Sequence, residues 1–156
     1  MSRLTIPTRE AAPAASQPLL DAVEKSLGVV PNLFRLVGQS PAALEGLLGL
    51  NGALGRALDP ATRERIALAV AQVNGCDYCG GSSDRRADAA VAFAAKVASE
   101  RGRVSDADIA AVKLAGYSEA QIVEIVGLVA VNVYTNFVNN VADTEIDFPV
   151  VRAAAA

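Results

Sequence analysis

Residues 118–141 read SEAQIVEIVGLVAVNVYTNFVNNV, and this stretch decides the fold class. Ser118 followed three residues later by Gln121 is the pattern of a capping box, which starts a helix. The residues after it are apolar on nearly every face of a helix, and a helix of that kind is buried on all sides. The stretch therefore predicts a long core helix. In a domain this small, it also predicts contact with a second subunit.

The rest of the chain carries helical signals of the same kind. Apolar residues recur at helical spacing, and several runs stop at a glycine such as Gly28 or Gly116. The pairs Ser40-Pro41 and Asp59-Pro60 each start a further helix. The predicted helices cover residues 19–27, 31–37, 41–58, 60–74, 84 to about 102, 105–116 and 119–141. No strand-period alternation appears, so we expect an all-α fold of several helices.

The length, charge and apolar runs of the chain restrict the expected number of domains and the expected binding partners. A chain of 156 residues fits one domain with a proper core, so we expect a single helical domain over 1–156 with an extended arm at 1–15. A net charge of −3 favours neither nucleic acid nor an anionic membrane surface. No apolar run reaches the roughly 18 residues of a spanning helix, and the start lacks a signal-peptide core. We expect a cytoplasmic protein.

Residues 74–79 read Asn-Gly-Cys-Asp-Tyr-Cys and contain the only two cysteines, Cys76 and Cys79, of a chain without histidine. A C-x-x-C pair can cycle between dithiol and disulfide. In a reducing compartment, such a pair is more often catalytic or metal-binding than a structural crosslink. One alternative is a pair of small buried apolar residues. A zinc site would have to form between subunits, because zinc needs four ligands. The spacing and the Gly75 break favour redox chemistry.

Seven stretches spread over nearly the whole chain carry a shared pattern. They are Val30-Pro31-Asn32-Leu33-Phe34-Arg35, Ser40-Pro41-Ala42-Ala43-Leu44, Arg63 to Cys79, Ala87 to Ala94, Ser105 to Ile109, Gly116-Tyr117-Ser118 and Thr144 to Pro149. Together they resemble the carboxymuconolactone decarboxylase superfamily, and most closely its alkylhydroperoxidase D-like, peroxidase-related branch. The resemblance implies an all-helical homo-oligomer, commonly a trimer or hexamer, that needs no metal or organic cofactor.

The resemblance also implies the roles of three residues. Cys79 attacks a hydroperoxide, Cys76 resolves the product as a disulfide, and Glu64 relays the proton; an external dithiol restores the pair. From the residues alone, Glu64 is a solvated glutamate near a helix N-terminus, where a negative charge is favourable. It precedes Cys76 by 12 residues, so it approaches the thiols only if the next segment folds back.

The chain departs from the resembled pattern after Cys79. The family's histidine, four residues further on, is replaced by Ser83, whose hydroxyl has no useful basicity near pH 7. Gly80 and Gly81 disfavour a helix there, and the flanks join as if a helix and a loop were missing. We therefore expect a thiol-dependent peroxidase weakened by this loss. The alternative is a catalytically silent helical oligomer that serves assembly or binding, and a lactone decarboxylase is disfavoured because that branch generally lacks the C-x-x-C.

Two further groups of polar residues have plain interpretations. Arg85 and Arg86 are expected on a solvated face. Four asparagines interrupt the last helix, and we expect them to form buried or interfacial hydrogen bonds. They are Asn132, Asn136, Asn139 and Asn140.

Overall fold

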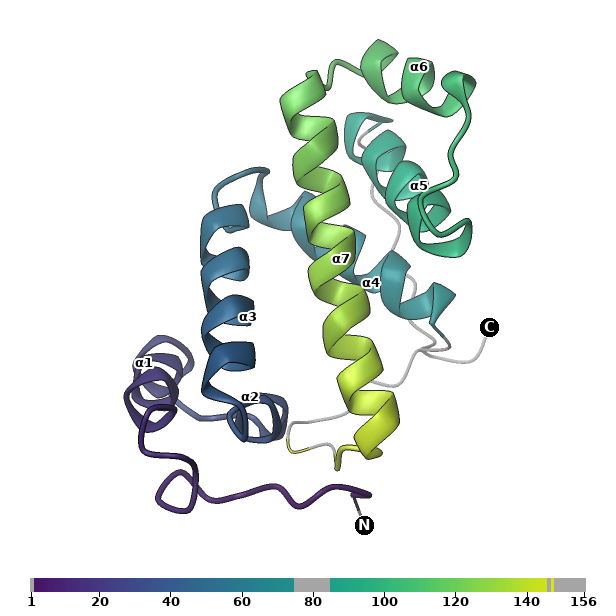
Figure 1. Ribbon diagram of the computed structural model, residues 1–156. Helices are drawn as coiled ribbons and strands as arrows, with labels where there is room; N and C mark the ends of the chain where they lie inside the picture. Colours follow the sequence, from purple (N-terminus) through teal and green to yellow (C-terminus); the bar gives the residue numbers. More distant parts are fainter. Residues whose placement is uncertain (1, 75–84, 146, 148–156) are drawn as a thin grey trace. The chain divides into compact units, whose positions relative to one another are not determined.

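The computed structural model describes residues 2–74, 85–145 and 147. Within these residues the chain forms seven α-helices and no strand (Figure 1). The helices are α1 (Gln17–Leu27), α2 (Asn32–Val37), α3 (Pro41–Leu54), α4 (Pro60–Val73), α5 (Arg85–Ser99), α6 (Asp106–Leu114) and α7 (Glu119–Ala142). The predicted all-α fold is confirmed.

The capping residues start the helices where the sequence predicts. The Asp59 side chain accepts a hydrogen bond from the Thr62 N–H at 2.9 Å, and α4 begins at Pro60. At the start of α7, the Gln121 N–H donates to Ser118 Oγ (3.2 Å) and the Ser118 N–H donates to Gln121 Oε1 (3.1 Å). These reciprocal bonds satisfy amide groups that a helix start leaves unpaired.

Two helices end three or four residues earlier than predicted. The third helix ends at Leu54 and not at Leu58, because Gly52 and Gly55 are weak helix formers and the chain turns with a bond from the Ala57 N–H to the Leu54 carbonyl. The helix expected to reach about Gly102 ends at Ser99. Arg101 and Gly102 have φ of 54° and 80°, and the Gly102 N–H bonds back to the Val97 carbonyl at 2.8 Å. That is a left-handed helix stop.

The chain divides into two compact units. One unit contains residues 1–49 and 135–151, and the other contains residues 50–134 and 152–156. The helices α3 and α7 contribute residues to both units. The single domain expected over 1–156 stays a prediction.

The core of the first unit comes from the first three helices. Its buried apolar residues include Leu20 and Val23 of α1, Leu36 and Val37 of α2, and Leu44 and Leu47 of α3. The N-terminal arm is fastened to the other end of the chain, since the Glu145 N–H donates to Ser2 Oγ at 3.0 Å. Arg9 of the arm also pairs with Asp21 of α1.

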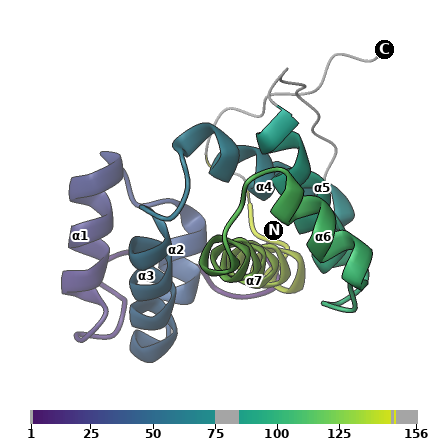
Figure 2. The ribbon, with the colours of Figure 1, turned by 90° about the horizontal axis from the view of Figure 1, so that it is seen from above.

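The second unit holds the larger core. Its buried residues come from four helices: Ile66 and Val70 (α4), Ala90, Phe93, Ala94 and Val97 (α5), Val112 (α6), and Ile122, Ile125, Leu128 and Val129 (α7), with Tyr117 between α6 and α7. Both views show α5 between α4 and α6 (Figures 1 and 2). The segment that contains both cysteines joins α4 to α5 in the sequence.

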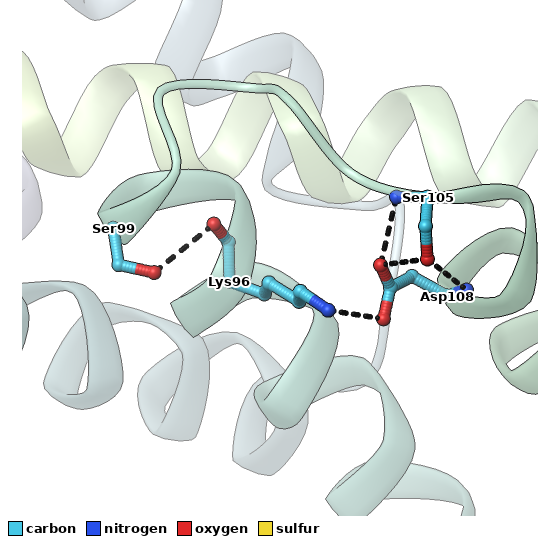
Figure 3. A network of polar contacts seen from close by, with 4 residues as sticks. All are labelled: Lys96, Ser99, Ser105 and Asp108. Atoms are coloured by element: carbon cyan, nitrogen blue, oxygen red, sulfur yellow. Dashed lines mark hydrogen bonds and ion pairs between the residues drawn. The ribbon is translucent and has the colours of Figure 1, made fainter.

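One polar network fastens α5 to α6 (Figure 3). Lys96 Nζ lies 2.8 Å from Asp108 Oδ1, and the other carboxylate oxygen accepts from the Ser105 N–H (2.8 Å) and hydroxyl (2.6 Å). The hydrogen bonds from Lys96 and Ser105 lower the pKa of Asp108 to about 2. The predicted cap at Ser105 is thus also an attachment point for α5.

The long helix α7 is apolar on its inward and on its outward side. It is long and apolar enough to cross a membrane by length and composition. Ile125 is fully buried, and Leu128 and Val129 are nearly so. Packing in the core of the second unit accounts for these inward residues, but only 28% of the apolar window of the helix is buried.

Candidate functional site

Both cysteines predicted to carry the chemistry, Cys76 and Cys79, lie outside the described residues, and so does Ser83. The chain fixes their place between elements. The helix α4 ends at Val73 and α5 begins at Arg85, so residues 74–84 connect two helices that lie side by side. The described part of the candidate site therefore consists of residues of α4 and α5 on either side of this connection.

Glu64, the predicted proton relay, lies on the exposed side of α4. Its neighbours Ile66 and Val70 face the core and are fully buried. The Glu64 side chain forms no hydrogen bond or ion pair with any other described residue. It precedes Val73 by nine residues, which places it about 14 Å from the end of α4 along the helix axis. This position is the solvated one that the residues alone predict, and the relay role stays a prediction.

An ion pair joins α4 to the first turn of α5. The guanidinium of Arg65 contacts the carboxylate of Asp88, and the Arg65 side chain is only 16% exposed. Burial and pairing hold this arginine in one place. This ion pair thus links the stretch 63–79, which contains both cysteines, to the stretch 87–94, and both stretches carry the family pattern.

Arg86 links α5 to the turn between α6 and α7. Its guanidinium lies over the ring of Tyr117, 4.3 Å from the ring centre. Its Nη2 also donates to Gln121 Oε1 at 3.4 Å. Arg86 is exposed, as predicted for a solvated residue, but the prediction missed these contacts. The capping pattern at Ser118 and Gln121 predicts the turn before α7. No local pattern predicts that Arg86, far away in the sequence, will contact this turn.

Four arginines flank the cysteine segment in the sequence, and four carboxylates lie among or near them: Glu64, Asp77, Asp84 and Asp88. Arg63 and Arg65 precede it on α4, and Arg85 and Arg86 follow it on α5. A neighbouring cation favours the thiolate form of a cysteine. Asn74, the last described residue before the segment, ends α4 with its N–H bonded to the Val70 and Ala71 carbonyls, and its buried side-chain Nδ2 has no hydrogen-bond partner among the described residues.

The framing residues offer no metal centre. Among the described residues, no group of three or more His, Cys, Asp or Glu side chains is placed to hold a metal ion. Cations and amide donors suit an anion better than they suit a metal.

The asparagines of α7 divide into two kinds. Asn132 Nδ2 donates to the Leu128 carbonyl one turn back, at 2.8 Å. Asn136 Nδ2 and Asn139 Oδ1 are buried without a hydrogen-bond partner among the described residues. The predicted buried hydrogen bonding is therefore seen at Asn132, whereas these two amide atoms remain unsatisfied.

The chain has recognisable relatives. Residues 41–83 match the sequence pattern of the carboxymuconolactone decarboxylase family. No curated protein is similar enough to match. Among solved structures, a peroxidase-related protein from Ralstonia eutropha JMP134 with an alkylhydroperoxidase AhpD core is 22% identical, with a TM-score of 0.81 over 94% of this chain and 92% of that one. A peroxidase-related protein from Silicibacter sp. TM1040 is 18% identical, with a TM-score of 0.78 over 94% and 92%.

A third similar structure is named for an activity other than peroxide reduction. It is the debrominase Bmp8 in complex with 2,3,4-tribromopyrrole, 19% identical, with a TM-score of 0.76 over 94% of each chain. At these identities the likeness shows the fold, while the family match covers Glu64 and both cysteines. Sequence pattern and fold thus agree with the predicted resemblance: residues 41–83 match the carboxymuconolactone decarboxylase family, and the chain has an alkylhydroperoxidase D-like fold.

Proposed function

We propose that the protein is a thiol-dependent peroxidase, or disulfide oxidoreductase, that acts through Cys76 and Cys79. The observation that carries the proposal is the position of the C-x-x-C. It lies inside the segment with the family pattern and connects α4 to α5, in a fold shared with peroxidase-related proteins. Neither a metal nor an organic cofactor is needed for this chemistry.

The proposed reaction has three steps. The Cys79 thiolate attacks the terminal oxygen of a hydroperoxide, the O–O bond breaks, and an alcohol leaves as Cys79 becomes a sulfenic acid. The Cys76 thiol then displaces the hydroxyl of that acid, which releases water and forms the disulfide. An external dithiol reduces the disulfide by exchange and is itself oxidised to a disulfide.

We expect proton transfer to limit the rate of the proposed reaction. With no histidine in the chain, Glu64 is the predicted acceptor of the thiol proton. Because Glu64 is exposed and about 14 Å from the end of α4, a proton reaches it through water. The arginines that flank the segment cannot accept a proton. We therefore expect a slow enzyme.

The predicted homo-oligomer, a trimer or hexamer, remains part of the proposal. The outward residues of α7 include large apolar side chains that would be exposed to water in a monomer. They are Val123, Val126, Tyr134, Phe137 and Val141, which are 40–71% exposed. A second copy of the chain is the proposed occupant of this face. The same face supports the alternative function, a catalytically silent oligomer for assembly or binding. A cytoplasmic location, without nucleic-acid or membrane partners, is also proposed.

The decisive experiment measures hydroperoxide consumption with a dithiol reductant for the wild type, Cys79→Ser and Cys76→Ser. Turnover that both substitutions abolish supports the proposal. A wild type that consumes no peroxide and keeps two titratable thiols after one equivalent of peroxide supports the silent oligomer. A parallel reaction with 2,3,4-tribromopyrrole tests the activity named for the third relative, because reductive debromination by the dithiol would release bromide.

A further inference from the structure

Helix α7 carries an exposed apolar stripe that runs along most of its length. At 3.6 residues per turn, the members of this stripe lie within an arc of about 80° around the helix and extend over about 27 Å. They are Val123, Val126, Ala130, Tyr134, Phe137 and Val141, all of them exposed. A contiguous exposed apolar patch of this kind marks an interaction surface.

The sizes of the side chains in this stripe are arranged symmetrically about Ala130. Val126 and Tyr134 lie four residues to either side of it, and Val123 and Phe137 lie seven residues to either side. The smallest side chain is thus at the centre, and each larger one has a counterpart at the same distance. A two-fold axis at Ala130 would place each of these valines beside an aromatic ring of a second copy. This is the self-complementary pattern of an isologous contact.

The charges at the two ends of α7 favour one direction for such a contact. Asp143 and Glu145 follow the end of α7 and are exposed, and this end is also the negative end of the helix dipole. Parallel helices would bring these carboxylates of both copies together. Antiparallel helices bring them toward the start of α7 in the second copy, where the dipole is positive and Lys113 pairs with Glu119 at 2.6 Å.

The composition of α7 favours a second copy over a membrane surface as the occupant of the stripe. Helices that lie on a membrane surface carry Lys and Arg on their polar face, whereas α7 contains neither and has Glu119 and Glu124 as its charged residues. The net charge of the whole chain is −3, which also opposes binding to anionic lipid.

We propose that α7 packs antiparallel against α7 of a second copy, with the two-fold axis at Ala130. The small side chain at the axis lets the helices approach to an interaxial distance of about 8–10 Å. Val126 then packs beside Tyr134 of the second copy, and Val123 packs beside Phe137 of the second copy. The proposal rests on the homo-oligomer of the proposed function and is independent of the peroxidase reaction. A hexamer built from three dimers contains such a two-fold contact, whereas a closed trimer contains none.

Disulfide crosslinking locates the axis. The full chain carries Cys76→Ser and Cys79→Ser in this experiment, so that only the introduced thiols react. At the proposed interaxial distance, the Cα atoms of residue 130 in the two copies lie about 3.5–5.5 Å apart, which overlaps the range that a disulfide requires. Ala130→Cys should therefore form a covalent dimer on oxidation. Ala110→Cys, at an exposed alanine of α6, is the matched control and should form none.

A second set of cysteine variants determines the direction of the helices. Co-expressed Val126→Cys and Tyr134→Cys chains, distinguished by a mass tag, should crosslink to each other. Tyr134→Cys alone should not crosslink, because its two copies would lie about 12 Å apart along the helix axis. The proposal is overturned if Tyr134→Cys alone forms a covalent dimer, or if Ala130→Cys forms no more of it than Ala110→Cys does.

The size of the side chain at the axis separates a close crossing from a general apolar patch. Ala130→Leu should force the helices apart and raise the dimer dissociation constant about 5- to 150-fold in sedimentation experiments, while Ala130→Ser stays small and should leave it nearly unchanged. Tighter association of Ala130→Leu would overturn the proposal. A wild type that sediments as a closed trimer would also overturn it, and a 16.0 kDa monomer would refute the proposed oligomer as well. Peroxide consumption by the wild type decides the peroxidase separately.

Discussion

Replacing Ile125 by alanine tests whether the chain folds as one cooperative domain. Ile125 lies on α7 in the core of the second unit and is fully buried. Truncating a fully buried isoleucine to alanine removes three carbon atoms and leaves a cavity, which costs about 2–5 kcal/mol. At roughly 2–4 °C of melting temperature per kcal/mol for a chain of this length, a loss of about 3 kcal/mol lowers Tm by roughly 6–12 °C.

Hydrogen exchange read by mass spectrometry gives the result separately for each unit. Since α3 and α7 contribute residues to both units, we expect unfolding of the second unit to break helices that the first unit needs. The slowest amides of α1 and of α5 should therefore lose protection together. A loss of about 3 kcal/mol accelerates their exchange on the order of 100-fold.

Two control variants define the scale of this experiment. Ile125→Val should cost only about 0.5–1.5 kcal/mol, because it removes one methylene. Leu114→Ala changes a residue of α6 that is 90% exposed and outside the proposed oligomer face, and it should stay within about 0.5 kcal/mol. If Ile125→Ala accelerates exchange in α5 but leaves α1 unchanged, the chain is two independent folding units and the single-domain prediction is wrong.

Three further predictions concern assembly, pH and the turn before α7. Phe137→Glu places a charge on the exposed face of α7 and should lower the mass measured by analytical ultracentrifugation; a wild type that sediments as a 16.0 kDa monomer would refute the oligomer. The pKa of Asp108 is lowered to about 2 in the folded chain, so its contribution to stability is complete above the unfolded pKa of about 3.9 and is lost as pH falls toward 2. Urea denaturation between pH 2 and 6 should show a weaker pH dependence for Asp108→Asn, and identical slopes would exclude this role. Gly116→Ala forces a side chain into φ of +93° and should lower the free energy of unfolding by about 1 kcal/mol, whereas an unchanged value would show that the turn relaxes.

The helix starts were predictable because their signals are local. Asp59 and Ser105 cap the helices that follow them, and both bond to backbone groups within three residues. The helix ends were less predictable where the signal is spread over several weak residues. Leu58 continues the apolar stripe of α3 in the sequence, but Gly52 and Gly55 reduce helix stability enough for the chain to turn first.

The frame of the candidate site depends on contacts that the sequence does not display. Arg65 and Asp88 are separated by 23 positions and meet only because α4 packs against α5. The outward face of α7 shows the same limit. The apolar pattern of α7 does not distinguish Val129, which is 4% exposed and belongs to the core, from Phe137, which is 55% exposed. Which apolar residues face outward is decided by packing partners that lie elsewhere in the chain.

The absence of histidine from the sequence determines how pH should affect the proposed peroxidase reaction. A thiol next to an imidazole loses its proton to a neighbouring base at neutral pH. Here the described residues next to the segment supply arginines, which cannot accept the thiol proton, and an exposed Glu64. Formation of the thiolate is then governed by the thiol itself, whose ordinary pKa is about 8.5. The rate of peroxide consumption should rise toward pH 8–9 and disappear in Cys79→Ser. A rate that is fast and flat from pH 6 upward would refute this reasoning, because it would show that another group strongly lowers the pKa of the cysteine.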